Sequence, residues 1–387
     1  MDLASRATIL TPSLTLSIDS KAKAMIAEGL DVCSFGAGEP DFDTPEHIKA
    51  AAMASLDGGF TKYTPSSGIP ELRQAIADKL LEENKIAYKP SQVIVSNGAK
   101  HSCFNAILAT IEPGDEVIIP APYWLSYPEM VRLAGGEPVF VETTEESGWK
   151  MTPQQFEDAM TPRTKMVIIN TPGNPTGAVY TREELVALAA VAEEEGILIL
   201  SDEIYEKLTY DGAEHVSIAS LSPEIYDLTI TINGFSKAYA MTGWRLGYLA
   251  APDPIAKAID SIQSHSTSNP CAFAQKGGLA ALKGNQQQVS DMRDEFEMRR
   301  NYMFQRFSNI KGVSVIKPEG AFYMIVNISR LSLTSQNFAD RLLSKANVAV
   351  VPGIAFGDDR IVRFSYATSM DIIKKGLDRF EEFTRTL

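Results

Sequence analysis

The sequence contains a lysine whose surroundings suit covalent chemistry. Lys237 lies in residues 233–248 among small residues, and Arg245 follows it after eight positions. A lysine amine can form a Schiff base with an aldehyde, and an arginine beside it can bind a phosphate group carried by the same molecule. This interpretation depends on the other residues that accompany Lys237, because a lysine near glycines is commonly a solvated loop residue.

A phosphate site is predicted at residues 93–101, where a short apolar run is followed by Gly98 and the start of a helix. Free amides at a helix N-terminus attract anions. Gly98 lets the backbone approach closely, and the amides of Ala99 and Lys100 would face the phosphate oxygens. Turns of this kind also occur without a ligand, and Arg245 could equally form a surface ion pair, so neither feature is decisive alone.

Further residues suit an aromatic nitrogen ring. Asp202 ends an apolar run, and a carboxylate beside a pyridine nitrogen keeps that ring protonated and electron-withdrawing. Tyr205 and Asn174, the latter in the rigid loop 170–177, can hydrogen-bond a phenolic oxygen on the ring, and Trp124 can stack on it. Taken singly, Asp202 would be a helix N-cap, Asn174 a turn residue and Trp124 a core residue. Together with the amine and the phosphate site, they are what pyridoxal phosphate requires.

A second cation is predicted to bind a substrate carboxylate. Arg363 lies in the otherwise apolar run 362–366. A buried arginine is costly without an anion, and its fork suits the α-carboxylate of an amino acid. The alternative is an internal salt bridge. Gly38 would let the backbone approach the same carboxylate.

Composition limits the classes of function. The hydrophobic content of 44% is that of an ordinary globular chain, and the length of 387 residues suggests two domains. A net charge of −13 argues against nucleic-acid and anionic-membrane partners. The three cysteines are scattered, so we predict neither a disulfide framework nor a metal site, and expect a reducing compartment.

The N-terminus resembles neither a signal peptide nor a transit peptide, and no apolar run approaches the roughly 18 residues of a membrane-spanning helix. We therefore expect a cytoplasmic protein, or a plastid one if a transit peptide has been removed.

The order of apolar runs predicts an α/β fold. Short runs at residues 93–95, 117–119, 166–169, 197–200 and 228–232 end in polar or turn residues, with helical stretches between most of them. This alternation indicates a largely parallel sheet flanked by helices, with the ligand at the carboxyl ends of the strands. Those ends carry Gly98, loop 170–177, Asp202 and Lys237.

The C-terminal part has a different pattern. Apolar residues at helical spacing from Val289 to Phe307 predict a long helix. Strand-like segments at 320–326, 348–351 and 361–366 and a helix from Met370 then indicate a smaller α+β unit. We predict a large domain at residues 46–280 and a small domain formed by residues 1–45 and 281–387, joined by the long helix.

The motifs, in their order along the chain, resemble fold-type I aminotransferases that depend on pyridoxal phosphate, and within them the prokaryotic and plastid-type aspartate and prephenate aminotransferases. The matching segments are residues 37–42, 62–65, 122–124, 174–177, 201–205, 236–237 with 243–245, and 363–365. The resemblance implies a large domain with a mainly parallel seven-stranded sheet between helices, plus a smaller α+β domain.

The resemblance also implies roles for single residues. Lys237 would be the Schiff-base lysine and proton shuttle, and Arg363 would hold the substrate α-carboxylate. The ring would contact Asp202, Asn174, Tyr205 and Trp124, and the phosphate would contact Gly98, Ala99, Lys100, Ser236, Arg245 and, from the other subunit of a homodimer, Tyr63. Two departures matter: some relatives have a serine at Gly234, and the distal arginine of animal-type aspartate enzymes aligns with Ser264. Lys100, helped by hydroxyls near Ser13, would bind the distal carboxylate instead.

The implied reaction is a ping-pong transfer of an amino group between amino acids and 2-oxo acids, with the pairs aspartate/oxaloacetate and glutamate/2-oxoglutarate. Prephenate, aromatic or alanine partners remain alternatives. A lyase or decarboxylase on the same scaffold, and a regulatory protein that has borrowed the fold, are rivals; against the latter, no basic helix-turn-helix candidate precedes Met25.

Overall fold

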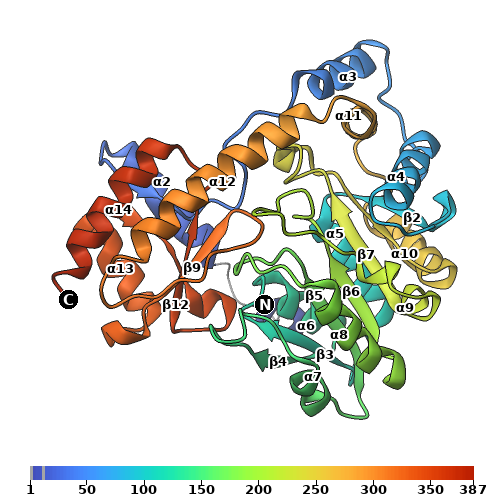
Figure 1. Ribbon diagram of the computed structural model, residues 1–387. Helices are drawn as coiled ribbons and strands as arrows, with labels where there is room; N and C mark the ends of the chain where they lie inside the picture. The colour runs from blue at the N-terminus through green and yellow to red at the C-terminus, as the bar shows by residue number, and fades with distance from the viewer. Residues whose placement is uncertain (1–2, 11–13) are drawn as a thin grey trace.

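A seven-stranded sheet forms the centre of the larger part of the molecule (Figure 1). The computed structural model describes residues 3–10 and 14–387. The strand order is β2-β8-β7-β6-β5-β3-β4, and β8 alone runs antiparallel to its neighbours β2 and β7. The strands are β2 (Val93–Ser96), β3 (Glu116–Ala121), β4 (Glu137–Glu142), β5 (Thr164–Asn170), β6 (Leu198–Asp202), β7 (Thr229–Gly234) and β8 (Gly247–Ala250). The predicted α/β fold with a mainly parallel sheet is confirmed.

Helices cover both faces of this sheet because alternate residues of each strand point to opposite faces. On β5, Ile168 packs in a cluster with residues of α5 and α6, whereas Ile169 packs in another with residues of α8. The helices are α1 (Ser5–Thr8), α2 (Leu14–Ala27), α3 (Glu46–Asp57), α4 (Pro70–Glu82), α5 (Ala99–Thr110), α6 (Ser126–Ala134), α7 (Pro153–Ala159), α8 (Arg182–Glu195), α9 (Pro223–Leu228), α10 (Asp253–Ser266), α11 (Ala272–Lys283), α12 (Gln287–Phe307), α13 (Ser335–Ala346) and α14 (Met370–Thr384).

The second part of the molecule contains two small sheets. The strands β11 (Val351–Pro352), β12 (Ile361–Ser365) and β9 (Tyr323–Asn327) form an antiparallel sheet, and β1 (Cys33–Ser34) pairs in parallel with β10 (Val348–Ala349). Figure 1 shows α12 leading from the α3 and α11 side toward α13 and α14. The β1–β10 pairing joins the N-terminal segment to the C-terminal part, as the predicted division of the chain requires; the domain boundaries themselves stay a prediction.

One predicted strand begins later than expected. The apolar run at 320–326 becomes a strand only from Tyr323, because Ala321 has a φ of +58°. A residue in this left-handed region cannot continue a strand. The same turn brings Ala321 against the hydroxyl of Tyr210.

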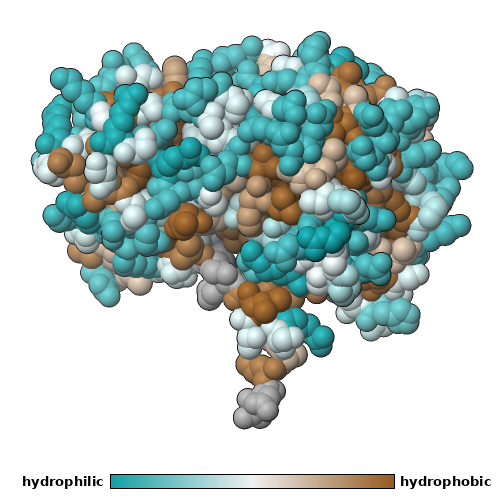
Figure 2. Space-filling view, turned by 90° about the horizontal axis from the view of Figure 1, so that it is seen from below, coloured by the Kyte–Doolittle hydropathy of each residue, from teal (hydrophilic) through white to brown (hydrophobic). Residues whose placement is uncertain are grey.

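Residues 3–10 project from the body of the molecule, and Figure 2 shows both apolar and polar residues on this projection. Leu3, Ile9 and Leu10 are among the exposed hydrophobic residues. Across the described part of the chain, every helix is either too short or too polar to traverse a bilayer.

Candidate functional site

A cavity of about 660 Å³, here called the Lys237 pocket, lies where β5, β6 and β7 end. Strand β12 and the segment before α3 close its other side. Of the residues predicted from the sequence, the pocket is lined by Gly38, Ala99, Lys100, Trp124, Asn174, Asp202, Tyr205, Ser236, Lys237, Arg245 and Arg363. Residues that are far apart in the sequence therefore meet in one enclosed space.

Three predicted residues do not line this cavity. Gly98 lies directly behind it, as the N-cap of α5. Tyr63 is 91% exposed on the surface, away from the pocket of its own chain. Ser13 lies outside the described residues.

The amine of Lys237 lies inside the pocket and donates a hydrogen bond to the carbonyl oxygen of Gly38. Its enclosed position lowers the pKa of Lys237 to about 8; Glu39 opposes this shift, and the cations Arg363 and Arg245 add to it. A lysine with this pKa is about one-tenth neutral at pH 7, a far larger share than for an ordinary lysine, and the neutral amine is the form that a nucleophile or a proton carrier needs.

Asp202 is buried at the end of β6 and holds its carboxylate through three donors. The hydroxyl of Tyr127 donates to Oδ2 at 2.7 Å, the Sγ of Cys103 lies 3.8 Å from the same oxygen, and the amide of Ile204 donates to Oδ1 at 3.2 Å. Burial raises the pKa of Asp202, and these donors oppose the rise. The helix N-cap, weighed as the alternative, is not formed, since residues 204–207 form a turn.

The end of the pocket near Gly98 has the features of an anion site. Gly98 has a φ of +87°, and a Cβ at this position would lie 2.7 Å from Nη2 of Arg245. Arg245 donates to the carbonyl oxygens of Thr242 and Asn97 at 2.9 and 3.3 Å, and within the described residues it forms no ion pair. The amides that open α5 and this uncompensated guanidinium fit a phosphate group.

Arg363 is buried without a carboxylate partner in the described part of the chain. Its Nη1 donates to Oδ1 of Asn174 and its Nη2 to the carbonyl oxygen of Gly36, each at 3.0 Å, while its Nε has no partner. The guanidinium also lies 4.3 Å from the ring centre of Tyr323. The internal salt bridge, weighed as the alternative, is not formed, so the site can accept an anion from outside.

Two tyrosines in the pocket were not predicted. Tyr323 lies 2.9 Å, hydroxyl to hydroxyl, from Tyr205 and stacks on Arg363, and Tyr127 binds Asp202. Both side chains are buried. Tyr323 sits in an apolar run and Tyr127 in a helix, so neither has a local signal that separates it from a core tyrosine.

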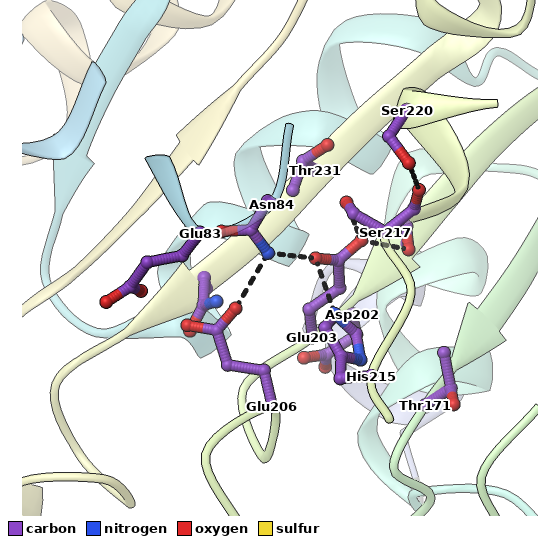
Figure 3. A network of polar contacts seen from close by, with 12 residues as sticks. Glu83, Asn84, Thr171, Asp202, Glu203, Glu206, His215, Ser217, Ser220 and Thr231 are labelled. Atoms are coloured by element: carbon purple, nitrogen blue, oxygen red, sulfur yellow. Dashed lines mark hydrogen bonds and ion pairs between the residues drawn. The ribbon is translucent and has the colours of Figure 1, made fainter. Parts of the chain in front are cut away.

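Behind Asp202 lies a second group of charges, here called the Glu203 network: Glu203, Glu206, Lys79, Asn84 and His215. Figure 3 shows Asn84 between the two carboxylates, with Nδ2 donating to Oε2 of Glu206 at 2.8 Å and reaching Oε2 of Glu203 at 3.5 Å. Lys79 pairs with Glu206, and Nε2 of His215 lies 3.0 Å from Glu203. The three acid and imidazole groups have a spacing that a cation could use, but Lys79 already neutralises Glu206.

Comparisons with known proteins agree with this geometry. The model of the family "aminotransferase class I and II" matches residues 31–380. The aspartate aminotransferase of Bacillus sp. (strain YM-2) is 50% identical over 99% of both chains, and the probable aspartate/prephenate aminotransferase of Aquifex aeolicus is 49% identical over 98% of both. The structure is similar, with a TM-score of 0.95 and 44% identity over 99% of both chains, to that of Thermus thermophilus aspartate aminotransferase with maleate.

The family model spans most of the chain, and relatives are about half identical to it over nearly its full length. The chain therefore belongs to the class I and II aminotransferases, and it is a pyridoxal phosphate-dependent aminotransferase.

Proposed function

We propose that this enzyme transfers the amino group of L-aspartate to 2-oxoglutarate in a ping-pong reaction. The observation that carries the proposal is the pair of cations in one pocket: the half-buried Lys237, which can hold the cofactor, and the buried Arg363, which has no carboxylate partner of its own among the described residues. An amino acid that reaches Lys237 would bring its α-carboxylate to Arg363.

The pocket offers a partner for each part of the cofactor. When bound, pyridoxal phosphate supplies an aldehyde that takes up the amino group and a ring that accepts negative charge from the substrate α-carbon. We assign Lys237 to the aldehyde, Asp202 to the pyridine nitrogen, Trp124 to the ring face, Asn174 and Tyr205 to the phenolic oxygen, and Gly98, Ala99, Lys100, Ser236 and Arg245 to the phosphate.

Lys237 would also move the proton. Its pKa of about 8 leaves Nζ partly neutral at physiological pH, so it can remove the proton from the substrate α-carbon and return it. Arg363 and the backbone at Gly38 would hold the substrate so that this carbon faces Nζ.

Lys100 is our candidate for the distal carboxylate of a dicarboxylic substrate. Its Nζ lies 5.0 Å from the ring centre of Trp124, inside the pocket. Burial, followed by repulsion from Arg245, lowers the pKa of Lys100, so an anion that restores its charge balance would be favoured. The Thermus thermophilus relative was crystallised with maleate, a dicarboxylate, which supports this class of substrate. The predicted help from Ser13 is outside the described residues.

The experiment that tests the substrate is a single-turnover half-reaction of the holoenzyme with one amino acid at a time. We expect aspartate and glutamate to react faster than alanine, and Lys100→Ala to slow the acidic pair by about 10- to 100-fold more than alanine, because one charged contact is lost. If both classes slow equally, Lys100 does not bind the distal carboxylate. If no amino acid transfers its amino group to the bound cofactor, the enzyme is not a transaminase of amino acids.

A second candidate activity uses prephenate as the acceptor. The size of the cavity, which extends to Thr15, Ala22 and Ile26 of α2, and the flexible point charge of Lys100 in place of an arginine fork favour it. The Aquifex aeolicus relative is named as a probable aspartate/prephenate aminotransferase. Comparing kcat/KM for prephenate and 2-oxoglutarate with aspartate as donor distinguishes the two.

We further propose that the active unit is a homodimer in which Tyr63 completes the phosphate site of the other subunit. Tyr63 is 91% exposed and does not line the pocket of its own chain, so its side chain can contact another subunit. Sedimentation equilibrium of the holoenzyme tests the dimer: a monomer with full activity would contradict it. The cytoplasmic location stays a prediction from the sequence.

A further inference from the structure

Asp202 is a buried carboxylate that, in the described part of the chain, has no paired cation to stabilise its negative charge. It is 4% exposed, and no ion pair to it is found among the described residues. Burial favours the protonated acid, and the neighbouring Glu203 adds to this effect. The charged form therefore depends on the hydrogen bonds that reach the carboxylate.

Tyr127 makes the shortest of these bonds. Its hydroxyl donates to Oδ2 of Asp202 at 2.7 Å, whereas Cys103 is a weak donor at 3.8 Å and the amide of Ile204 serves the other oxygen. Tyr127 is 2% exposed, and burial together with the nearby carboxylate holds its pKa well above the usual value. The phenol is thus a permanent donor, and Asp202 is its hydrogen-bond partner.

The same tyrosine is fixed against the residue proposed to cover the cofactor ring. Helix α6 starts at Ser126, directly after Trp124, and the amide of Tyr127 donates to the carbonyl oxygen of Trp124 at 3.0 Å. The two rings meet edge to face, with centroids 5.1 Å apart at 84°. The side chain of Tyr127 therefore contacts both Trp124 and the carboxylate of Asp202, and it also lines the pocket.

We propose that Tyr127 is a positioning residue of this aminotransferase, whose hydroxyl keeps Asp202 charged and correctly oriented toward the pyridine nitrogen of the cofactor. The inference rests on the role proposed above for Asp202. A hydrogen bond to a carboxylate favours its charged form. Without that bond, Asp202 would take up a proton more readily and would be less able to keep the pyridine nitrogen of a bound cofactor protonated.

The test is Tyr127→Phe, which removes the hydroxyl and keeps the ring packed on Trp124. The direct readout is the ¹⁵N chemical shift of the labelled pyridine nitrogen in the holoenzyme, expected to move from the protonated value toward the neutral one. In parallel, kcat with aspartate should fall by about 10- to 100-fold, the equivalent of one hydrogen bond to a charged group, with KM changed by no more than about twofold. An unchanged ¹⁵N shift together with wild-type kcat would overturn the proposal.

Two variants serve as controls. Tyr180→Phe removes another buried hydroxyl, one that accepts a hydrogen bond from the amide of Met151 and does not touch Asp202; it should leave the ¹⁵N shift and kcat as in the wild type. Cys103→Ala removes the weaker contact to the same oxygen. It should lower kcat by less than about threefold and move the ¹⁵N shift in the same direction as Tyr127→Phe, but by less. A larger effect from Cys103→Ala or Tyr180→Phe than from Tyr127→Phe would count against the proposal.

Asp202→Asn separates this inference from the proposed function. If that variant leaves the ring nitrogen protonated, the role of Asp202 is wrong and the inference falls with it. If it gives a neutral nitrogen and Tyr127→Phe does not alter the shift, only the role of Tyr127 is wrong.

Discussion

Asp202 and Glu203 are neighbours in the chain, yet their carboxylates enter different environments. Glu203 is fully buried and receives hydrogen bonds from Ser201 and Ser217 at 2.8 and 2.6 Å, with His215 at 3.0 Å. Asp202 lines the open pocket and has no ion-pair partner among the described residues. The carboxylate of Glu203 belongs to the Glu203 network, which lies inside the protein, whereas that of Asp202 belongs to the Lys237 pocket, which a ligand can enter.

The two groups differ in how they balance charge. In the Glu203 network, Lys79 pairs with Glu206, and Lys207 pairs with Glu83 at 2.7 Å. Burial alone would raise the pKa of Glu206, but attraction to Lys79, with smaller contributions from His215 and Lys207, lowers it to about 2. In the Lys237 pocket, by contrast, Arg363 and Arg245 form no ion pair with a carboxylate of the described residues. The comparison teaches that a buried charge indicates a ligand site only when the protein itself leaves it uncompensated.

The largest effect is expected from Lys237→Ala. This change removes the residue proposed both to hold the cofactor and to carry the proton, so kcat should fall by about 10⁴-fold or more. Steady-state turnover with aspartate and 2-oxoglutarate measures it, and circular dichroism shows whether the fold is kept. Normal turnover would exclude Lys237 as the proton carrier.

Removing a charge from the Glu203 network should lower the stability of the fold and leave the catalysed reaction unchanged. Lys79→Met leaves Glu206 as an uncompensated buried charge and should lower the free energy of unfolding by about 3–5 kcal/mol. Lys21→Met, which removes an exposed pair with Asp340 at 3.4 Å, should cost less than about 1 kcal/mol. Urea denaturation measures both.

The same pair predicts how stability depends on pH. Because the pKa of Glu206 is depressed to about 2, its stabilisation is complete above the ordinary glutamate pKa of 4.5 and is lost as the pH falls toward 2. In Lys79→Met this loss should shrink or reverse, because burial raises the pKa of Glu206 once Lys79 is gone, and protonation then relieves the uncompensated buried charge. Equal acid profiles for the wild type and the variant would contradict the pairing.

Arginine-to-lysine changes compare a buried arginine that lacks a carboxylate partner with one that has partners. Arg363→Lys removes the fork from the pocket and should raise KM for aspartate by about 10- to 100-fold. Arg300 is equally buried but pairs with Asp211 and Glu297 at 3.0 and 3.2 Å. Arg300→Lys should lower the melting temperature and leave KM unchanged. A similar rise of KM in both variants would show that the effect is not specific to the pocket.

The smallest effect concerns cofactor loading. Only the neutral amine of Lys237 can react with an aldehyde, and its pKa lies at about 8 instead of 10.5. The rate at which the cofactor-free enzyme takes up pyridoxal phosphate should therefore rise about tenfold from pH 6 to 7 and level off above about 8. Absorbance-monitored reconstitution gives the profile; a midpoint near 10 would mean that the pocket does not perturb this lysine.

The sequence was most informative where function requires a local pattern. The runs that end at Gly98, Asp202 and Lys237 combine a buried strand with a polar or glycine-rich turn, and parallel strands bring their carboxyl ends to one edge. The pocket could be assembled from this rule. The strands β4 and β8 had no such signal: β4 lies at the edge of the sheet and buries only Pro138 and Val141, and β8 (Gly-Tyr-Leu-Ala) contains no β-branched residue.

Contacts between distant segments could not be predicted. Tyr127 and Asp202 are 75 positions apart, and Tyr205 and Tyr323 are 118 apart. Nor did the sequence indicate that Glu203 turns away from its neighbour, because the motif at 201–205 contains two adjacent acids of the same chemical type. Which of them faces a ligand depends on how α4 and the loop around His215 pack behind the strand.

The length of β6 therefore has a consequence for how this enzyme can change. Successive side chains of an extended chain alternate in direction. Inserting or deleting a single residue in that strand would therefore turn each of the two acids toward the side that the other now faces. The longer glutamate would then protrude among the ligand-binding groups, and the aspartate would fall short of Asn84 and His215. Reaction chemistry and internal charge balance would fail together, which makes this strand far less tolerant of length variation than the surface loops.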